Sequence, residues 1–143
     1  MKKSILTISL VLVSLFVTSS YGQIHIITND TTGLTLTWDH SGLDINGKTE
    51  HIIRYDIYQN KNDEGYVLIG MTPKDSVNYN PVKSYQVTDL EANSKYEFGV
   101  VAVDWAFNES EMHKSIDVTA AYGGWYIILD VTPPRKSSGL DSQ

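Results

Sequence analysis

The chain has 143 residues, no cysteine, and a formal net charge of −6 at pH 7. An acidic chain repels phosphate backbones and anionic lipid surfaces, so nucleic acid is not an expected partner. Without cysteine, burial and hydrogen bonding rather than disulfides must stabilise the fold.

The first 22 residues have the pattern of a secretory signal peptide. Two lysines precede an apolar run over residues 5–17, and small residues at Ser20 and Gly22 precede the expected cleavage site before Gln23. The run is shorter than the roughly 20 residues of a membrane-spanning helix, so we expect no stable membrane insertion after cleavage. The mature chain of about 120 residues has room for one domain. We expect it to be secreted, or located in the periplasm or at the cell surface.

The mature chain alternates apolar and polar residues with the period of two that is typical of strands. Residues 34–38 and 53–57 each present one apolar face. Residues 40–48 between them are rich in Gly, Asp and Asn and are expected to form a loop. Residues 60–65 have the composition of a hairpin turn, and a strand is expected to follow at 66–70. No long stretch has helical periodicity, so the pattern predicts an all-β domain.

Two further strands flank a sharp corner. Leu90 ends one strand, and six residues later Tyr96 opens an alternation of apolar residues that continues to Ala102. We expect the first strand of the domain at residues 23–27. The last strand is expected at Ile116, Val118 and Ala120.

This pattern resembles the fibronectin type III family over roughly residues 33–120. Trp38 matches the core tryptophan of the family, Tyr55 lies in a segment similar to its third strand, and the stretch from Leu90 to Tyr96 matches its corner motif. The resemblance implies an immunoglobulin-like antiparallel β-sandwich of fibronectin type III type with a C-terminal extension, in which these four residues are structural. It also implies that the Tyr96 hydroxyl bonds to upstream backbone and ties the arch between the sheets.

The chain is thereby divided into three parts. These are a signal peptide over residues 1–22, a fibronectin type III-like domain over 23–121, and an extension over 122–143 that holds an apolar segment and a linker-like tail. The apolar segment, residues 125–129, is too hydrophobic to stay exposed to water. We expect it to dock on its own sandwich, in preference to pairing with the open edge of a neighbouring molecule.

The sequence contains no arrangement that predicts catalysis, a metal or another cofactor. The four histidines lack the close spacing of a zinc site. Residues 60–65 resemble a calcium loop only in part, because Met71 stands where the bidentate glutamate should fall. No serine lies in a nucleophile elbow, and no glycine-rich loop opens a helix. We therefore expect a protein that is not an enzyme.

The candidate binding residues are aromatic. Trp105 and Phe107 fall in the loop after the Tyr96 strand, where sandwiches often present binding residues. Trp105 either covers the end of the core as a lid, which we favour, or forms with Phe107 an exposed platform for a sugar or a partner protein. Trp125 and Tyr126 in the apolar segment are the other two candidates.

These observations predict an exported, non-catalytic binding or assembly module that mediates protein–protein contact at the cell surface or in an extracellular complex. The alternative is a carbohydrate-binding accessory module of a polysaccharide-degrading system. The partner is accordingly a protein or a polysaccharide, and the fold alone does not identify it.

Overall fold

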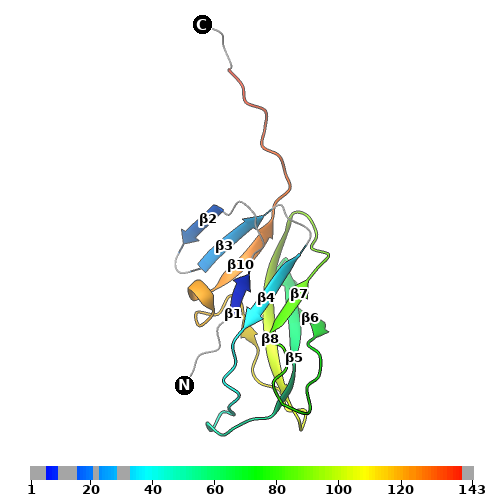
Figure 1. Ribbon diagram of the computed structural model, residues 1–143. Helices are drawn as coiled ribbons and strands as arrows, with labels where there is room; N and C mark the ends of the chain where they lie inside the picture. The colour runs from blue at the N-terminus through cyan, green and yellow to red at the C-terminus, as the bar shows by residue number, and fades with distance from the viewer. Residues whose placement is uncertain (1–5, 10–15, 21–22, 29–32, 140–143) are drawn as a thin grey trace.

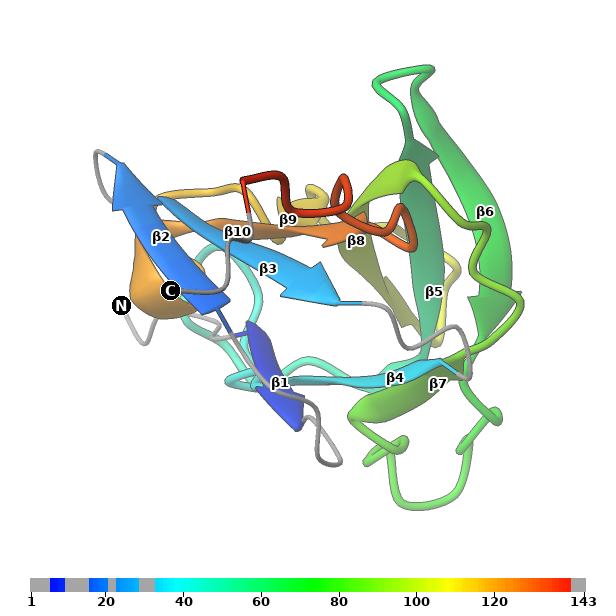
Figure 2. The ribbon, with the colours of Figure 1, turned by 90° about the horizontal axis from the view of Figure 1, so that it is seen from above.

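The computed structural model describes residues 6–9, 16–20, 23–28 and 33–139 of the chain. Two sheets face each other across one core (Figures 1 and 2). The smaller sheet has the strand order β1-β4-β7, and the larger has the order β2-β3-β10-β8-β5-β6, with β9 paired to β8. The strands are β1 (Leu6–Ser9), β2 (Phe16–Ser20), β3 (Gln23–Thr28), β4 (Leu34–Trp38), β5 (Ile52–Lys61), β6 (Tyr66–Met71), β7 (Ser84–Val87), β8 (Ser94–Asp104), β9 (His113–Lys114) and β10 (Trp125–Leu129).

Strand β4 carries the apolar face of the smaller sheet. Leu34, Leu36 and Trp38 are buried and alternate with two half-buried threonines, as the period of two predicts. On one side β4 pairs antiparallel with β7, where Leu36 lies opposite Tyr85. On its other side it pairs antiparallel with β1.

Strands β5 and β8 form the centre of the larger sheet. They pair antiparallel over nearly their whole length, with Ile57 opposite Val100. The outer face of β8 is covered as well as the core face, because Met112 in the chain after it packs against Gly99. A β-carbon on Gly99 would lie 2.5 Å from the sulfur of Met112, so a larger residue here would require the methionine side chain to move. Strand β8 is therefore buried on both faces.

The corner before β8 joins the core through a tyrosine. The Tyr96 hydroxyl accepts a hydrogen bond from the backbone amide of Glu91 at 2.6 Å. In the same core the rings of Trp38 and Tyr55 meet edge to face, with centroids 5.2 Å apart. Leu90 packs into this cluster too, so all four residues expected to be structural lie in the core. The expected fibronectin type III-like sandwich is confirmed.

The expected last strand at residues 116–120 is wrong. Strand β9 places Lys114 opposite Gly99, whereas β10 places Ile127 opposite Tyr96. The partners on β8 are three residues apart, but Lys114 and Ile127 are thirteen apart, so the final strand is interrupted by residues that loop out. Ser115 holds the junction, because its amide donates to the carbonyl of β8 at residue 98 and its carbonyl accepts from the amide of residue 125, both at 2.7 Å. Alternating apolar residues in the loop imitate a strand.

The apolar segment expected beyond the domain is strand β10 of the larger sheet. It pairs antiparallel with β8 and parallel with β3. Trp125, Ile127 and Leu129 are buried in the core. The preference for docking within the same chain is therefore confirmed. Trp125 is only 1 % exposed and its ring packs against Phe98 at 6.0 Å between centroids, which corrects its assignment as a binding residue.

Two strands lie within the expected signal peptide. In the full chain β1 pairs with β4, and β2 pairs with β3. Strand β3 agrees with the expected first strand of the domain. The cleavage site before Gln23 follows residues 21–22, which lie outside the described residues, so the leader and its removal stay predictions.

Candidate binding surface at the loop end of the sandwich

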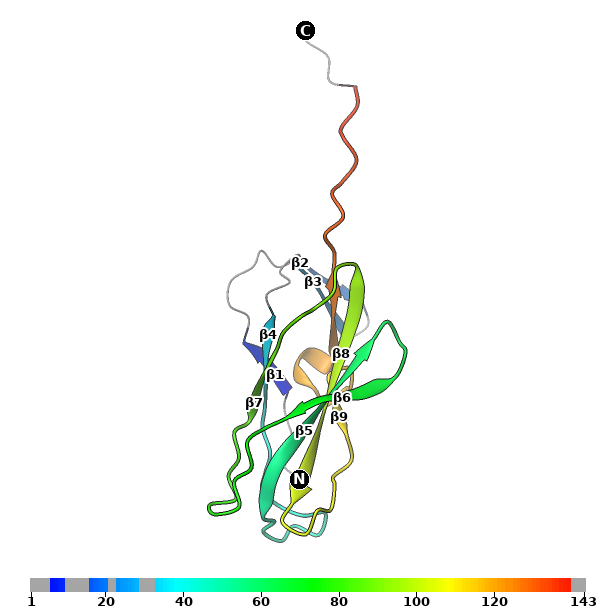
Figure 3. The ribbon, with the colours of Figure 1, turned by 90° about the vertical axis from the view of Figure 1, so that its right-hand side faces the viewer.

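Three loops gather at one end of the sandwich, opposite the end from which the C-terminal tail leaves (Figures 1 and 3). They join β4 to β5 (residues 39–51), β6 to β7 (residues 72–83) and β8 to β9 (residues 105–112). We call this the loop end. Binding residues on such loops are positioned by the rigid strands that they connect.

Asp104 at the end of β8 organises the third loop. One of its carboxylate oxygens accepts the backbone amides of Ala106 and Asn108, both at 2.8 Å, and the other accepts the side-chain amide of Asn108 at 2.8 Å. Burial alone would raise the pKa of Asp104, but the bonds from Asn108 and Ala106 outweigh it and lower the pKa. A charged carboxylate therefore holds a tight turn at neutral pH.

The turn directs the two aromatic candidates outward. Trp105 and Phe107 are each 62 % exposed, so the favoured interpretation of Trp105 as a lid on the core is wrong. The cause lies in the backbone: the Trp105 amide donates to the His51 carbonyl at 2.9 Å, and Phe107 adopts a positive φ of 66°. These features fix the backbone of the loop on which both rings are exposed.

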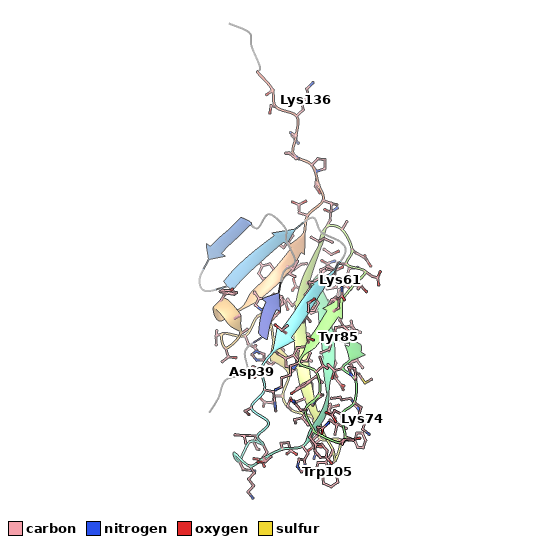
Figure 4. All side chains as sticks on the ribbon, viewed as in Figure 1. Asp39, Lys61, Lys74, Tyr85, Trp105 and Lys136 are labelled. Atoms are coloured by element: carbon pink, nitrogen blue, oxygen red, sulfur yellow. The ribbon has the colours of Figure 1, made fainter. Side chains whose placement is uncertain are left out.

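Other residues of the loop end extend this aromatic surface. The ammonium of Lys74 lies 5.6 Å from the centroid of the Phe107 ring (Figure 4). The rings of His51 and Tyr79 stack with centroids 4.3 Å apart. We call these four residues, together with Trp105, the aromatic patch. Sequence reasoning found only the two loop aromatics, because the others come from segments distant in sequence and carry no motif.

A groove lies beside the patch, between the first and third loops. Two adjoining cavities of about 340 and 450 Å³ share His40, Ile45, Glu109 and Ser110 in their walls. Trp38 also lines the larger cavity, together with Tyr55, Val100 and His113. We call the two cavities together the acidic groove, because carboxylates recur along them: Asp39, Asp44, Glu50, Asp104, Glu109 and Glu111.

The groove stays negative at neutral pH. None of the residues that line it is Lys or Arg, although Lys83 lies close enough to influence His40. Burial is the main cause that lowers the pKa of His40; Lys83 adds to this effect and Asp39 opposes it. Burial also lowers the pKa of His113, against the influence of Asp117. Both imidazoles are therefore uncharged at pH 7 and do not offset the carboxylates.

Two buried nitrogen atoms on groove residues have no hydrogen-bond partner among the described residues. These are the indole Nε1 of Trp38, which is only 7 % exposed as a residue, and Nε2 of His113. Buried polar atoms are nearly always paired in folded proteins. Both residues line the larger cavity, so a polar group that reached either nitrogen would satisfy it.

The remaining candidate, Tyr126, lies away from the loop end. It is half-buried on β10, and the ammonium of Lys95 lies 4.7 Å from its ring centroid. The structure thus brings together only Trp105 and Phe107 of the four expected binding residues. Among the described residues, no cluster of His, Asp and Glu is arranged to hold a metal ion. Within the same residues, no helix has the length and apolar character needed to cross a membrane.

A two-sheet sandwich with a tyrosine at the corner before β8 is the architecture of the immunoglobulin-like modules. The profile of the Fibronectin type III domain family matches residues 19–119. The chain therefore belongs to the fibronectin type III family, whose domains are generally used for protein–protein interaction or assembly. The comparison with the curated proteins found no match.

The comparison with solved structures found several matches. The twitchin kinase region from C. elegans matches with a TM-score of 0.51 and 13 % identity, over 82 % of this chain and 18 % of the twitchin chain. Fibronectin(III)-like modules of CbhA from Clostridium thermocellum match with a TM-score of 0.47 and 15 % identity, over 82 % of this chain and 97 % of theirs. The fourth FNIII domain of a human protein matches with a TM-score of 0.46 and 14 % identity, over 97 % of this chain and 88 % of that chain. At such identities the likeness concerns the fold alone.

Proposed function

We propose that the chain is an exported, non-catalytic module that binds a partner protein through the aromatic patch. The observation that carries this proposal is the exposure of Trp105 and Phe107, at 62 % each, on a loop fixed by Asp104. Large rings held in place by the backbone offer contact area at little cost in conformational entropy. Export rests on the leader pattern, and the non-catalytic role rests on the lack of catalytic motifs in the sequence.

The patch has the composition of a binding hot spot. Tryptophan and other aromatic residues dominate the energetics of protein interfaces, and an exposed cation beside them adds polar contacts at the rim. Lys74 supplies that cation next to Phe107. A partner with an apolar surface and a nearby carboxylate would match both features.

The test is capture of the partner from the cells that export the protein. We expect the purified protein to retain a defined partner, and Trp105→Ala with Phe107→Ala to lose it while keeping its denaturation midpoint. The matched control is Val67→Ala with Leu68→Ala, which truncates two exposed apolar residues on β6 and should retain the partner. Equal capture by both double variants would contradict the proposal.

The same rings favour one alternative. Exposed aromatic side chains also stack on the apolar faces of sugar rings, so a polysaccharide ligand would use Trp105 and Phe107 as well. Affinity electrophoresis in polysaccharide gels separates the two functions. Retardation that the patch variant loses and the β6 control keeps would assign the module to carbohydrate binding.

A further inference from the structure

The acidic groove has the features of a receptor for a basic peptide segment. Glu109 and Glu111 are exposed on its wall, and no lysine or arginine lines it. The indole N–H of Trp38 lacks an acceptor, which a backbone carbonyl of an incoming peptide would supply. Charge together with a free donor favours a peptide over a simple ion.

The chain itself carries a segment of matching chemistry. Residues 130–139 are exposed and extend away from the sandwich, and they include the adjacent cations Arg135 and Lys136 (Figure 4). Neither cation has an ion-pair partner among the described residues. Pro133 and Pro134 restrict the backbone just before the cations, which lowers the entropy lost when the segment is ordered.

The tail begins at the end of the sandwich that is far from the groove of its own molecule. Asn93 anchors it at the far end of the sandwich, because its side-chain oxygen accepts the Thr132 hydroxyl at 3.0 Å. Lys136 is four residues beyond this anchor, which is at most about 14 Å of chain. Glu111 follows Ser110, whose amide donates a hydrogen bond to the carbonyl of Ala102. At the spacing of strand residues, Ala102 and therefore Glu111 lie roughly 25 Å from the start of β8.

We propose that the acidic groove binds the Arg135–Lys136 segment of a second copy of the chain. The tail leaves one end of the molecule and the groove opens at the other, so the contact is heterologous and joins copies head to tail. In the contact, the two cations face Glu109 and Glu111, and a tail carbonyl accepts the Trp38 N–H. The association uses none of the rings of the aromatic patch, so it goes beyond the proposed function and does not rest on it.

Sedimentation velocity of the full chain over a concentration series tests this inference. We expect the average mass to rise with concentration, and high salt to weaken the association because the charges lie near the surface. Arg135→Glu with Lys136→Glu, and separately Glu109→Lys with Glu111→Lys, should each weaken it about tenfold or more. Both glutamates and both cations are exposed, so the variants are expected to fold.

Mixing the two charge-swapped variants is the decisive experiment. Each groove then meets a tail of opposite charge, so association should return in the mixture although each variant alone associates only weakly. A control at the far end, Glu64→Lys, changes an exposed glutamate outside the groove and should associate like the parent. If the groove swap unfolds the domain, Glu109→Gln with Glu111→Gln is used and should still weaken association.

Three results would overturn the inference. They are a parent that stays monomeric throughout the series, variants that associate as the parent does, and a mixture that stays monomeric. Trp105→Ala with Phe107→Ala should self-associate normally, which separates failure of this contact from failure of the proposed partner binding.

Discussion

The two ends of the sandwich use their aromatic residues in opposite ways. We call the end opposite the loop end, where the chain turns into β8, the corner end. Here Tyr96 and Trp125 are buried, and the backbone around them is hydrogen-bonded to neighbouring strands. At the loop end, Trp105 and Phe107 are exposed although they follow directly from a buried strand. The difference arises from backbone hydrogen bonding: β10 continues the sheet beside β8, whereas Asp104 turns the chain away from it. The corner end therefore supports the fold, and the loop end is free to bind.

Removal of the buried indole at the corner end should have the largest effect on stability. Trp125→Ala leaves a cavity against Phe98, so the free energy of unfolding should fall by about 3–5 kcal/mol. Urea denaturation followed by circular dichroism measures the change. Tyr122→Ala is the control, because Tyr122 is 71 % exposed in the neighbouring loop and its truncation should cost less than about 0.5 kcal/mol. Similar losses in the two variants would place Trp125 outside the core.

A smaller effect is expected from the corner hydroxyl alone. Tyr96→Phe keeps the ring but removes the acceptor of the Glu91 amide, so unfolding should become easier by roughly 1–3 kcal/mol. The same denaturation experiment measures it, with Tyr122→Phe as the exposed counterpart. An unchanged midpoint for Tyr96→Phe would mean that the hydroxyl does not tie the corner to the core.

The corner end could be predicted from the sequence far better than the loop end. The alternation over residues 34–38 and the spacing from Leu90 to Tyr96 reflect burial of one strand face and a local turn, which are short-range properties. The interruption at Ser115 was missed because Ile116, Val118 and Ala120 alternate like a strand while β10 forms its pairs instead. Exposure of Trp105 was missed because it depends on the carboxylate of Asp104 and the carbonyl of His51. The acidic groove is lined by loops that are distant in sequence, so no local sequence pattern predicts it.

The smallest effect concerns the pH dependence of stability at the groove, which includes the half-buried His113. Burial lowers the pKa of His113 below its ordinary value of 6.5, against the influence of Asp117, whose carboxylate oxygen lies 3.8 Å from Nδ1. The unfolded chain therefore binds a proton more readily than the folded one. The stability contributed by the uncharged His113 imidazole is fully present above about pH 6.5. It is lost as the pH falls through the lower pKa of the folded protein.

His113→Gln should accordingly lose less stability than the parent when the pH is lowered from about 7 to about 5. Part of the dependence should remain, because burial lowers the pKa of His40 in the same groove as well. His40→Gln is therefore the matched variant, and the double variant should show the flattest profile of the three. Urea midpoints across this pH range measure the effect. A His113→Gln profile parallel to that of the parent would mean that this imidazole titrates as freely in the folded protein as in the unfolded chain.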